Sequence, residues 1–578
     1  MHLTPDQKLA GILAPLFALR SADDLGVGDV GALRELIDWS AEHGFRVVQL
    51  LPVNETGNDN SPYNALSSVA LDPTTIEINA SSIPDLRPED LTAVLEGVNL
   101  EALRAGPVIY PLVKALKRDL LRRAFERFSE EHWKRTTTRA RNFKEFIKNE
   151  WSWIDGYALF RVLMEQQGGT ERWDHWPVEI QTAPAARKWL EKQTAKKRKD
   201  FEKEMRFMMY VQWIAWTQWM SVRQHAESKG VALMGDVPFG VSYYSADVFA
   251  EPDIFDHKWS GGAPPEPLFK DDPFTVKWGQ NWGVPLYRWD VLKARNYDWW
   301  RQRVSKIRHI FHLFRIDHIL GFYRIYGFPW RPQLNHEFLP LTPEEAKLRT
   351  VGELPRFLDF DDETAEHCEA NRKHGEQLLR PLLEETGEHR LIGEDLGTVP
   401  AYVRPSLTSL GIAGFKIPMW EQEWNTHLVS GNKYQRLSVA TYATHDHEPL
   451  RAMWDRWMAS IKAAEKGTEE EIRVRDWVWW EVRRLAEWAG FSVPESVPFE
   501  QVHEKFLNGL FRCNSWIAIC MVTDLFGTSQ RFNVPGAVAE SNWSQRLAAP
   551  VSAWKMDADL APRMQRIREI LTASGRVK

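Results

Sequence analysis

The sequence contains few cysteines and no long apolar segment. Cys368, Cys513 and Cys520 are the only three in 578 residues, which argues against a disulfide framework and for a reducing compartment. No apolar run approaches the roughly 20 residues that a membrane-spanning helix requires, and the first residues lack the basic region and cleavage site of a secretory signal. We therefore expect a soluble, cytoplasmic protein with no membrane partner.

A strongly basic balance is also missing. Lysine and arginine number 73 against 79 aspartates and glutamates, which gives a net charge of -6 with the 17 histidines neutral. Because binding to nucleic acid depends largely on positive charge, the sequence predicts no nucleic-acid partner. The one basic cluster, KKRK at Lys196–Lys199, lies in a lysine- and glutamate-rich helical pattern and is typical of a solvated helix face.

Tryptophan, in contrast, is abundant. The chain has 28 Trp beside 28 Phe and 13 Tyr. Core packing accounts for most of these rings, but this number suggests that a few line a groove in which flat apolar faces are needed. Sugar rings present such faces on their C–H sides, whereas nucleobases require the basic surface that is missing here.

Short, nearly continuous apolar runs recur along the chain, with helical patterns between most of them. Strands of this kind are typical of a parallel sheet that is covered on both faces. Eight of them, alternating with helices, predict an α/β fold of the (β/α)8 TIM-barrel type with inserted, largely helical subdomains. A doubly wound sheet is the alternative, weakened because no glycine-rich phosphate turn follows the first run. The runs span residues 11–19, 45–53, 231–239, 312–319, 389–396, 413–420, 437–446 and 515–527.

Uneven spacing between the runs locates the insertions. We interpret residues 1–578 as a single catalytic barrel unit. Nearly two hundred residues separate the second run from the third, and their charged amphipathic patterns predict an inserted helical subdomain at about 75–210. A second insertion, at about 250–300, is rich in proline, glycine and tryptophan, so we expect a loop region over the active-site cleft.

Four of the runs end in a carboxylate: Asp236 in GDVPF, Asp317 in FRIDH, Glu394 in GEDLG and Asp446 in THDH. The carboxyl ends of all barrel strands open on one face, where catalytic groups lie. Each acid alone could serve as a helix N-cap, but four together predict one acidic site. Paired carboxylates suit glycoside chemistry, in which retaining enzymes hold two carboxyls about 5 to 5.5 Å apart.

Arg315 lies two residues before Asp317, so both side chains share a face of the strand. A neighbouring guanidinium favours the carboxylate anion, as a nucleophile requires, although a purely structural ion pair gives the same pattern. Glu394 is the candidate acid, because crowding by other anions helps a carboxyl to keep its proton. Strand alternation allows only one of Glu394 and Asp395 to point inward, and the pattern does not choose between them.

A divalent metal site is the competing interpretation of the acidic cluster. His318 and His445 are suitable additional ligands. The guanidinium of Arg315 beside Asp317 would repel a cation, which weakens this alternative.

A series of motifs runs along most of the chain: GVGD at 26–29, LPVNETG at 51–57, SPYNALSSVALDP at 61–73, YVQWIAWTQW at 210–219, GDVPFGVSYYSADVF at 235–249, GAPPE at 262–266, WGVPLYRWD at 282–290, FRIDH, GEDLGTVP, THDH and RFNVPG at 531–536. With these motifs in this order, the chain resembles the amylomaltases, the 4-alpha-glucanotransferases of glycoside hydrolase family 77, from about Gly11 to Arg546. A single motif such as GEDLG is weak evidence, but the joint order of the motifs makes the resemblance specific.

The resemblance implies a retaining transferase that moves alpha-1,4-glucan segments between maltooligosaccharides, with no cofactor and no metal. In this family's pattern Asp317 is the nucleophile, Glu394 the acid/base and Asp446 a third, stabilising carboxylate. It further implies that Arg315 and His445 support these acids and that Tyr63, Asp236, Gln280, Trp282 and Asn533 bind substrate. The alternatives are a hydrolase that uses the same acids and a noncatalytic glycan-binding protein.

The sequence departs from the family pattern at three places. His447 stands after THD where asparagine is usual, and a histidine adds a titratable hydrogen-bonding group. In the loop from Gly261 to Trp282, which resembles one that arches over the cleft, Glu266 replaces the usual aspartate and Pro267 a common aromatic residue. EQEW follows AGFKIPMW, so the resemblance gives no role to its glutamates.

Overall fold

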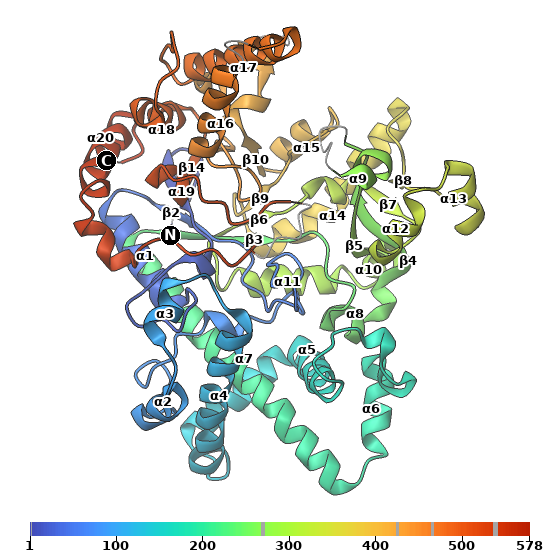
Figure 1. Cartoon of the computed structure of the whole chain (residues 1–578). Helices are drawn as coiled ribbons and strands as arrows, with labels where there is room; N and C mark the ends of the chain where they lie inside the picture. The colour runs from blue at the N-terminus through green and yellow to red at the C-terminus, as the bar shows by residue number, and fades with distance from the viewer. Residues whose placement is uncertain (2, 267–271, 424–426, 464–466, 536–540, 578) are drawn as a thin grey trace.

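Eight parallel strands form a closed barrel at the centre of the molecule (Figure 1). The structure is a computed structural model that describes residues 1–578 except 2, 267–271, 424–426, 464–466, 536–540 and 578. Strand neighbours in the barrel follow the order of the chain, and each predicted apolar run supplies one strand, so the barrel prediction is confirmed. The strands are β1 (Leu9–Leu13), β2 (Val47–Gln49), β3 (Ala232–Val237), β6 (Leu313–Ile316), β9 (Leu391–Gly393), β10 (Ala413–Lys416), β13 (Ser438–Ala440) and β14 (Ile517–Met521).

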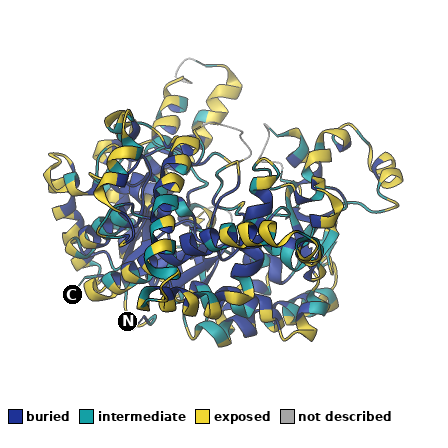
Figure 2. Cartoon of the chain, turned by 90° about the horizontal axis from the view of Figure 1, so that it is seen from below, coloured by how far each residue is buried: buried dark blue, intermediate teal, exposed yellow. Residues whose placement is uncertain are grey.

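Both faces of these strands are buried, which explains their nearly continuous apolar sequence. In β14, Ile517, Ile519 and Met521 pack in one core cluster, whereas the alternating Ala518 and Cys520 belong to another. The first cluster fills the barrel and the second packs beneath the surrounding helices, as the twofold side-chain period of a strand requires. Figure 2 accordingly shows a buried centre and helices whose outer sides are exposed.

Helices surround the barrel and separate its strands along the chain. None of the helices within the described ranges is long and apolar enough to cross a membrane. Of the helices that do not lie between β2 and β3, the longer ones are α1 (Val30–Glu42), α11 (Asp298–Ile307), α14 (Ala365–Thr386), α16 (Leu450–Ala463), α17 (Glu469–Trp488), α18 (His503–Arg512) and α20 (Leu560–Ala573). The shorter ones include α8 (Ala246–Ala250), α10 (Trp289–Ala294), α12 (Asn335–Phe338), α13 (Pro343–Arg349), α15 (Val403–Ser409) and α19 (Val522–Phe526).

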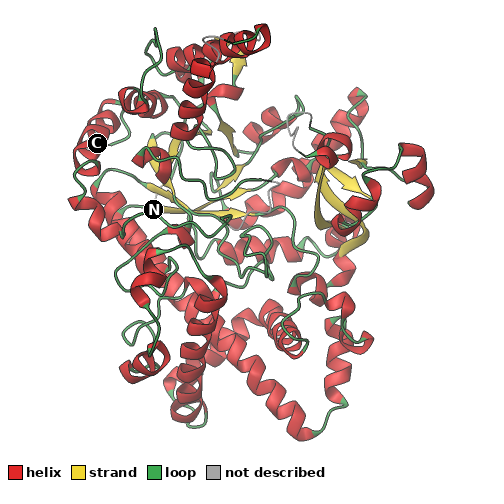
Figure 3. Ribbon diagram, viewed as in Figure 1, coloured by secondary structure: helices red, strands yellow, loops and turns green. Residues whose placement is uncertain are grey.

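The chain between β2 and β3 forms a helical lobe, which lies at the bottom of Figure 3. Its long last helix, α7, ends one residue before the apolar run of β3 and packs on α1 of the barrel wall. The limits of this insertion therefore stay a prediction, because α7 passes residue 210 without a break. The helices of the lobe are α2 (Pro88–Leu95), α3 (Leu100–Ala105), α4 (Tyr110–Phe128), α5 (Thr138–Gln166), α6 (Ala183–Glu191) and α7 (Ala195–Lys229).

The limits of the second insertion, about 250–300, also stay a prediction. Two strands within it, β4 and β5, pair with the later strands β7 and β8 in an antiparallel sheet of the order β5, β4, β7, β8, and the short helix α9 (Pro273–Trp278) lies between β4 and β5. At Gly262 an added Cβ would lie 1.9 Å from the carbonyl oxygen of Gln280, so glycine permits this close pairing. The strands are β4 (Phe255–Ala263), β5 (Gln280–Tyr287), β7 (Ile325–Phe328) and β8 (Arg356–Leu358).

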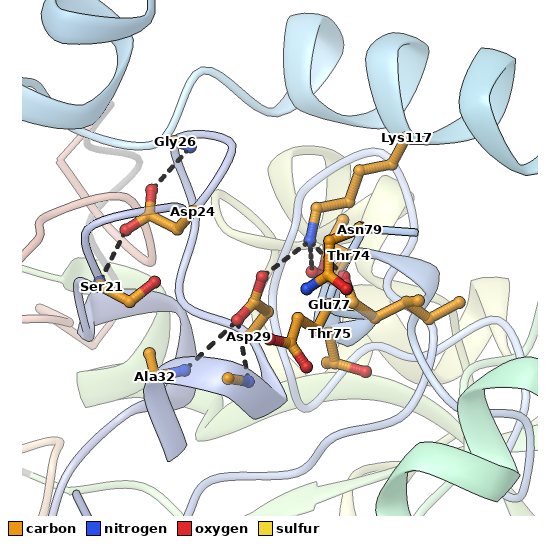
Figure 4. Close-up of polar contacts among 12 residues, drawn as sticks. Ser21, Asp24, Gly26, Asp29, Ala32, Thr74, Thr75, Glu77, Asn79 and Lys117 are labelled. Carbon is orange, nitrogen blue, oxygen red and sulfur yellow. Dashed lines mark hydrogen bonds and ion pairs between the residues drawn. The ribbon is translucent and has the colours of Figure 1, made fainter. Parts of the chain in front are cut away.

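A buried lysine attaches α4 of the helical lobe to the barrel wall (Figure 4). Only 1% of the Lys117 side chain is exposed. Its ammonium group donates to the carbonyl oxygens of Thr74 and Ile76 at 2.6 and 2.7 Å and lies 3.6 Å from Asp29. Asp29 is the N-cap of α1, where its carboxylate also accepts the backbone N–H of Gly31. One side chain of α4 thus contacts the loop at residues 74–76 and the N-terminal end of α1.

Replacement of this lysine should destabilise the protein strongly. In Lys117→Met the carboxylate of Asp29 and the two carbonyl oxygens lose a buried donor, which predicts a loss of about 3 to 5 kcal/mol in the free energy of unfolding. Urea unfolding of the variant measures this loss. Lys148→Met, at an exposed position of α5, is the matched control. Equal stability of the two variants would contradict the anchoring role of Lys117.

Candidate active site

The carboxyl ends of the barrel strands open into a cleft of about 1010 Å³. Eight of the ten predicted site residues line it. Asp317 and Glu394 directly follow β6 and β9, and Asp446 lies in the loop after β13. The predicted residues that line the cleft are Tyr63, Gln280, Trp282, Arg315, Asp317, Glu394, Asp446 and Asn533.

The guanidinium of Arg315 holds two carboxylates at once. Its Nη2 lies 2.8 Å from Oδ1 of Asp317, and its Nη1 lies 2.7 Å from Oδ2 of Asp236. Only 4% of the arginine side chain is exposed, against 29% of Asp317. Burial disfavours the cation, but the two carboxylates outweigh it and raise the pKa of Arg315 above its ordinary value. Arg315 is therefore a fixed cation that orients the Asp317 carboxylate at the cleft surface.

The expectation that Asp236 binds substrate stays a prediction, and the structure describes its protein contacts. Its side chain is fully buried, and the residue is absent from the cleft lining. The physical reason is strand register, because Asp236 of β3 pairs directly with Arg315 of β6. The hydroxyl of Tyr63 donates to the same carboxylate at 2.7 Å. Asp236 therefore faces two protein side chains and holds Arg315 on the side of the guanidinium away from the cleft.

Glu394 points into the cleft and Asp395 points away from it. Strand alternation predicts that only one of these two acids points inward, without showing which one. One carboxylate oxygen of Glu394 accepts the backbone N–H of His318 at 2.8 Å. Burial raises the pKa of Glu394 to about 7, Arg315 opposes the rise and Asp317 adds to it. The Asp395 carboxylate instead accepts the backbone N–H of Phe415 at 2.6 Å and is only 1% exposed as a residue. Glu394 can therefore carry a proton near neutral pH at the cleft surface.

Asp446 is held as an anion by its neighbours. The side-chain amide of Asn533 donates to Oδ1 at 2.6 Å, and Nε2 of His445 lies 3.2 Å from Oδ2. Burial acts to raise the pKa of Asp446, but His445 and Asn533 outweigh it and lower the pKa below its ordinary value. His445 is itself buried and stacks on Tyr63 with the ring centroids 5.0 Å apart. It lies behind the acid and outside the cleft lining.

Two exposed tryptophans flank the acids. Trp282 of β5 is 39% exposed; its indole N–H donates to Oε1 of Gln280 at 3.1 Å, and its ring meets His318 edge to face at 4.7 Å. Trp420 ends the 3₁₀ helix η9 (Pro418–Trp420) and is 47% exposed in the cleft. Sequence reasoning missed Trp420, although its position at the end of a predicted strand run was a usable signal. Flat, exposed rings of this kind suit sugar faces.

The cleft contains two further polar groups that are not among the ten predicted site residues. Arg531 lines the cleft and donates from Nη2 to the backbone carbonyl of Asp446 at 3.0 Å. Nδ1 of His447 accepts the backbone N–H of Thr444 at 3.2 Å, and burial lowers the pKa of His447. Its ring lies 5.0 Å from that of Trp420. His447 is therefore a neutral cleft residue beside the exposed tryptophan.

Part of the expected arching loop is described and part is not. Glu266 lines the cleft, whereas Pro267 lies outside the described residues. Among the residues that the structure describes, no group of three or more His, Cys, Asp or Glu side chains is arranged to hold a metal ion. The carboxylate oxygens of the cleft instead contact guanidinium, amide and backbone N–H groups.

Comparisons with known proteins agree with one another. A family model described as 4-alpha-glucanotransferase matches residues 14–552. The 4-alpha-glucanotransferase of Chlamydia pneumoniae is 30% identical over 554 residues, which cover 93% of this chain and 91% of that protein. The 4-alpha-glucanotransferase of Thermus thermophilus is 29% identical over 531 residues, or 90% and 91% of the two chains.

Solved structures show the same fold. The amylomaltase of Streptococcus agalactiae in complex with acarbose gives a TM-score of 0.71 at 22% identity, with 99% of this chain and 100% of that chain covered. The amylomaltase of Corynebacterium glutamicum gives 0.74 at 20% identity, with 99% and 76% covered. At these identities the likeness supports the fold alone.

The buried position of Asp236 allows a test of whether this residue supports Arg315 or contacts the sugar. If Asp236 supports Arg315, Asp236→Asn removes a fixed charge partner and displaces the guanidinium, which should lower kcat on maltotriose by about 100-fold. KM should change little, because the side chain does not reach the cleft. Steady-state kinetics separate the two constants, with Asp253→Asn at an exposed position as control. A raised KM with an unchanged kcat would instead indicate a sugar contact.

Proposed function

The chain belongs to the 4-alpha-glucanotransferases of glycoside hydrolase family 77, and we propose that it transfers alpha-1,4-glucan segments between maltooligosaccharides by a retaining double displacement. In this proposal Asp317 forms a covalent glycosyl intermediate and Glu394 acts as acid and then as base. The family model described as 4-alpha-glucanotransferase, which matches residues 14–552, supports an alpha-glucan as the substrate class.

The first displacement breaks the donor linkage. Glu394 gives its proton to the glycosidic oxygen while a carboxylate oxygen of Asp317 attacks the anomeric carbon. The bond from that carbon to the glycosidic oxygen breaks, and the glucan that carries the new hydroxyl leaves. Positive charge grows on the sugar ring in the transition state, and Asp446, an anion at the same cleft, stabilises it.

The second displacement forms the product linkage. Glu394, now a carboxylate, takes the proton of the 4-hydroxyl of an acceptor glucan, and that oxygen displaces Asp317 from the anomeric carbon. Two inversions retain the alpha configuration. Transfer exceeds hydrolysis only if the acceptor is held in place against water, a role that we assign to the exposed rings of Trp282 and Trp420.

The observation that carries this proposal is the different environment of the two central carboxyls. Asp317 lies 2.8 Å from a buried guanidinium, whereas the pKa of Glu394 is raised to about 7. A carboxyl that is paired with a guanidinium suits the nucleophile, and a carboxyl that keeps its proton near neutral pH suits the proton donor. The mechanism further requires their oxygens to lie about 5 to 5.5 Å apart in the substrate complex.

Maltotriose tests the reaction type. A transferase converts it into glucose and a ladder of longer oligosaccharides, whereas glucose and maltose without longer products would indicate a hydrolase. Asp317→Asn should lower turnover by more than about 10³-fold, because the nucleophile is lost. Asp290→Asn, with a side chain that is 75% exposed, is the control. Turnover of Asp317→Asn within twofold of the parent would contradict the assignment.

The raised pKa of Glu394 predicts the pH dependence. The free enzyme must carry the Glu394 proton to begin the reaction, so kcat/KM should fall as the pH rises through about 7. A pH profile with maltotriose measures this limb. With an alpha-maltosyl fluoride donor, whose leaving group needs no proton, the limb should disappear. A profile with maltotriose that stays level to about pH 9 would contradict the role of Glu394 as the acid.

A further inference from the structure

A network of two acids and two cations lies behind the part of the cleft that carries Trp420. Nε of Arg404 is 3.0 Å from Oδ2 of Asp395, and Nη2 of the same arginine is 3.2 Å from Oε1 of Glu421. Nζ of Lys416 lies 2.8 Å from Oε2 of Glu421. The network thus connects residues of three segments, since Lys416 ends β10, Arg404 belongs to α15 and Asp395 follows β9.

Glu421 is the centre of this network. Its side chain is only 10% exposed, and each carboxylate oxygen contacts a different cation. Its backbone is fixed as well, because its N–H donates to the carbonyl of Ile417 at 3.2 Å and its own carbonyl accepts the N–H of Val429 at 2.7 Å. The residue therefore has little freedom to rotate, although it does not line the cleft.

The two ends of the network are neighbours of cleft residues. Asp395 directly follows Glu394, and Glu421 directly follows Trp420. Both partners point away from the cleft while the preceding residues point into it. Arg404 pairs with both acids and so links the two ends of the network, and 44% of its side chain is exposed.

We propose that Glu421 is a positioning residue that fixes the Trp420 ring as a sugar platform relative to the acid/base Glu394. This inference rests on the proposed transferase function. Glu421 contacts no substrate and acts through its neighbour in the chain. A rigid platform matters here because orientation of the sugar, and not contact area alone, determines whether its reacting atoms meet the acids.

Stability alone is a weak explanation for such a network. Desolvation of buried charges offsets much of their attraction, so an apolar replacement often stabilises a fold equally well. What a doubly paired carboxylate does provide is a single orientation for the main chain beside it. Among the described ring contacts, Trp420 has only the edge contact with His447. Contacts of the tryptophan ring itself therefore do little to fix its orientation.

Binding of acarbose in a double-mutant cycle tests the proposal. Glu421→Gln keeps the size of the side chain and removes its charge, and it should weaken acarbose binding about fivefold. Trp420→Ala should weaken binding at least as much. If Glu421 acts through the ring, Glu421→Gln should have no further effect once Trp420 is alanine. Isothermal titration measures all four affinities.

Glu423→Gln is the matched control, because Glu423 pairs with Lys433 on the exposed side of the same segment. The affinity of this variant for acarbose should equal that of the parent. Full affinity of Glu421→Gln for acarbose, or effects of the two substitutions that multiply, would overturn the proposal.

If Glu421→Gln fails to fold, Lys416→Gln replaces it in the same cycle, because this substitution removes one of the two cations that hold the Glu421 carboxylate. Kinetics with maltotriose separate the two hypotheses: a parent enzyme without a transfer ladder refutes the proposed function, whereas an active parent with an unaffected Glu421→Gln refutes this inference alone.

Discussion

The active site depends on one buried guanidinium. Arg315 contacts Asp236 beneath the cleft and Asp317 at its surface, and Tyr63 closes the arrangement through its bond to Asp236. A cation so far from solvent is stable only because two carboxylates surround it. The same attraction orients Asp317, so a carboxylate that stabilises the buried arginine is also the group that the proposed mechanism uses as nucleophile.

Three carboxyl groups that line the cleft have different surroundings. Asp317 has the guanidinium, Asp446 has an imidazole and an amide, and Glu394 has a single backbone N–H and a half-buried position. The pKa of Glu394 rises while that of Asp446 falls. One kind of group, the carboxyl, thus occurs in two protonation states within a single cleft, because the environment of each group sets its protonation.

Much of the fold was predictable because strand burial leaves a direct trace in sequence. The eight apolar runs became the eight barrel strands, and the acids at their ends came together as the geometry of a parallel barrel requires. The antiparallel sheet of β4, β5, β7 and β8 was not predictable in the same way. Its strands are joined by long-range pairing, and its glycine- and proline-rich segments favour loops by local propensity.

The sequence by itself determined which residue types stand at the strand ends, because chain order and side-chain period are local properties. It also placed Arg315 and Asp317 on one face of one strand. Only the tertiary structure decided that Glu394 and not Asp395 faces the cleft, that register turns Asp236 toward Arg315, and that Trp420 and Glu421 lie on opposite sides of the cleft wall. These choices depend on how neighbouring strands are shifted and on which side of each strand finds a charged partner, and neither is encoded within a single segment.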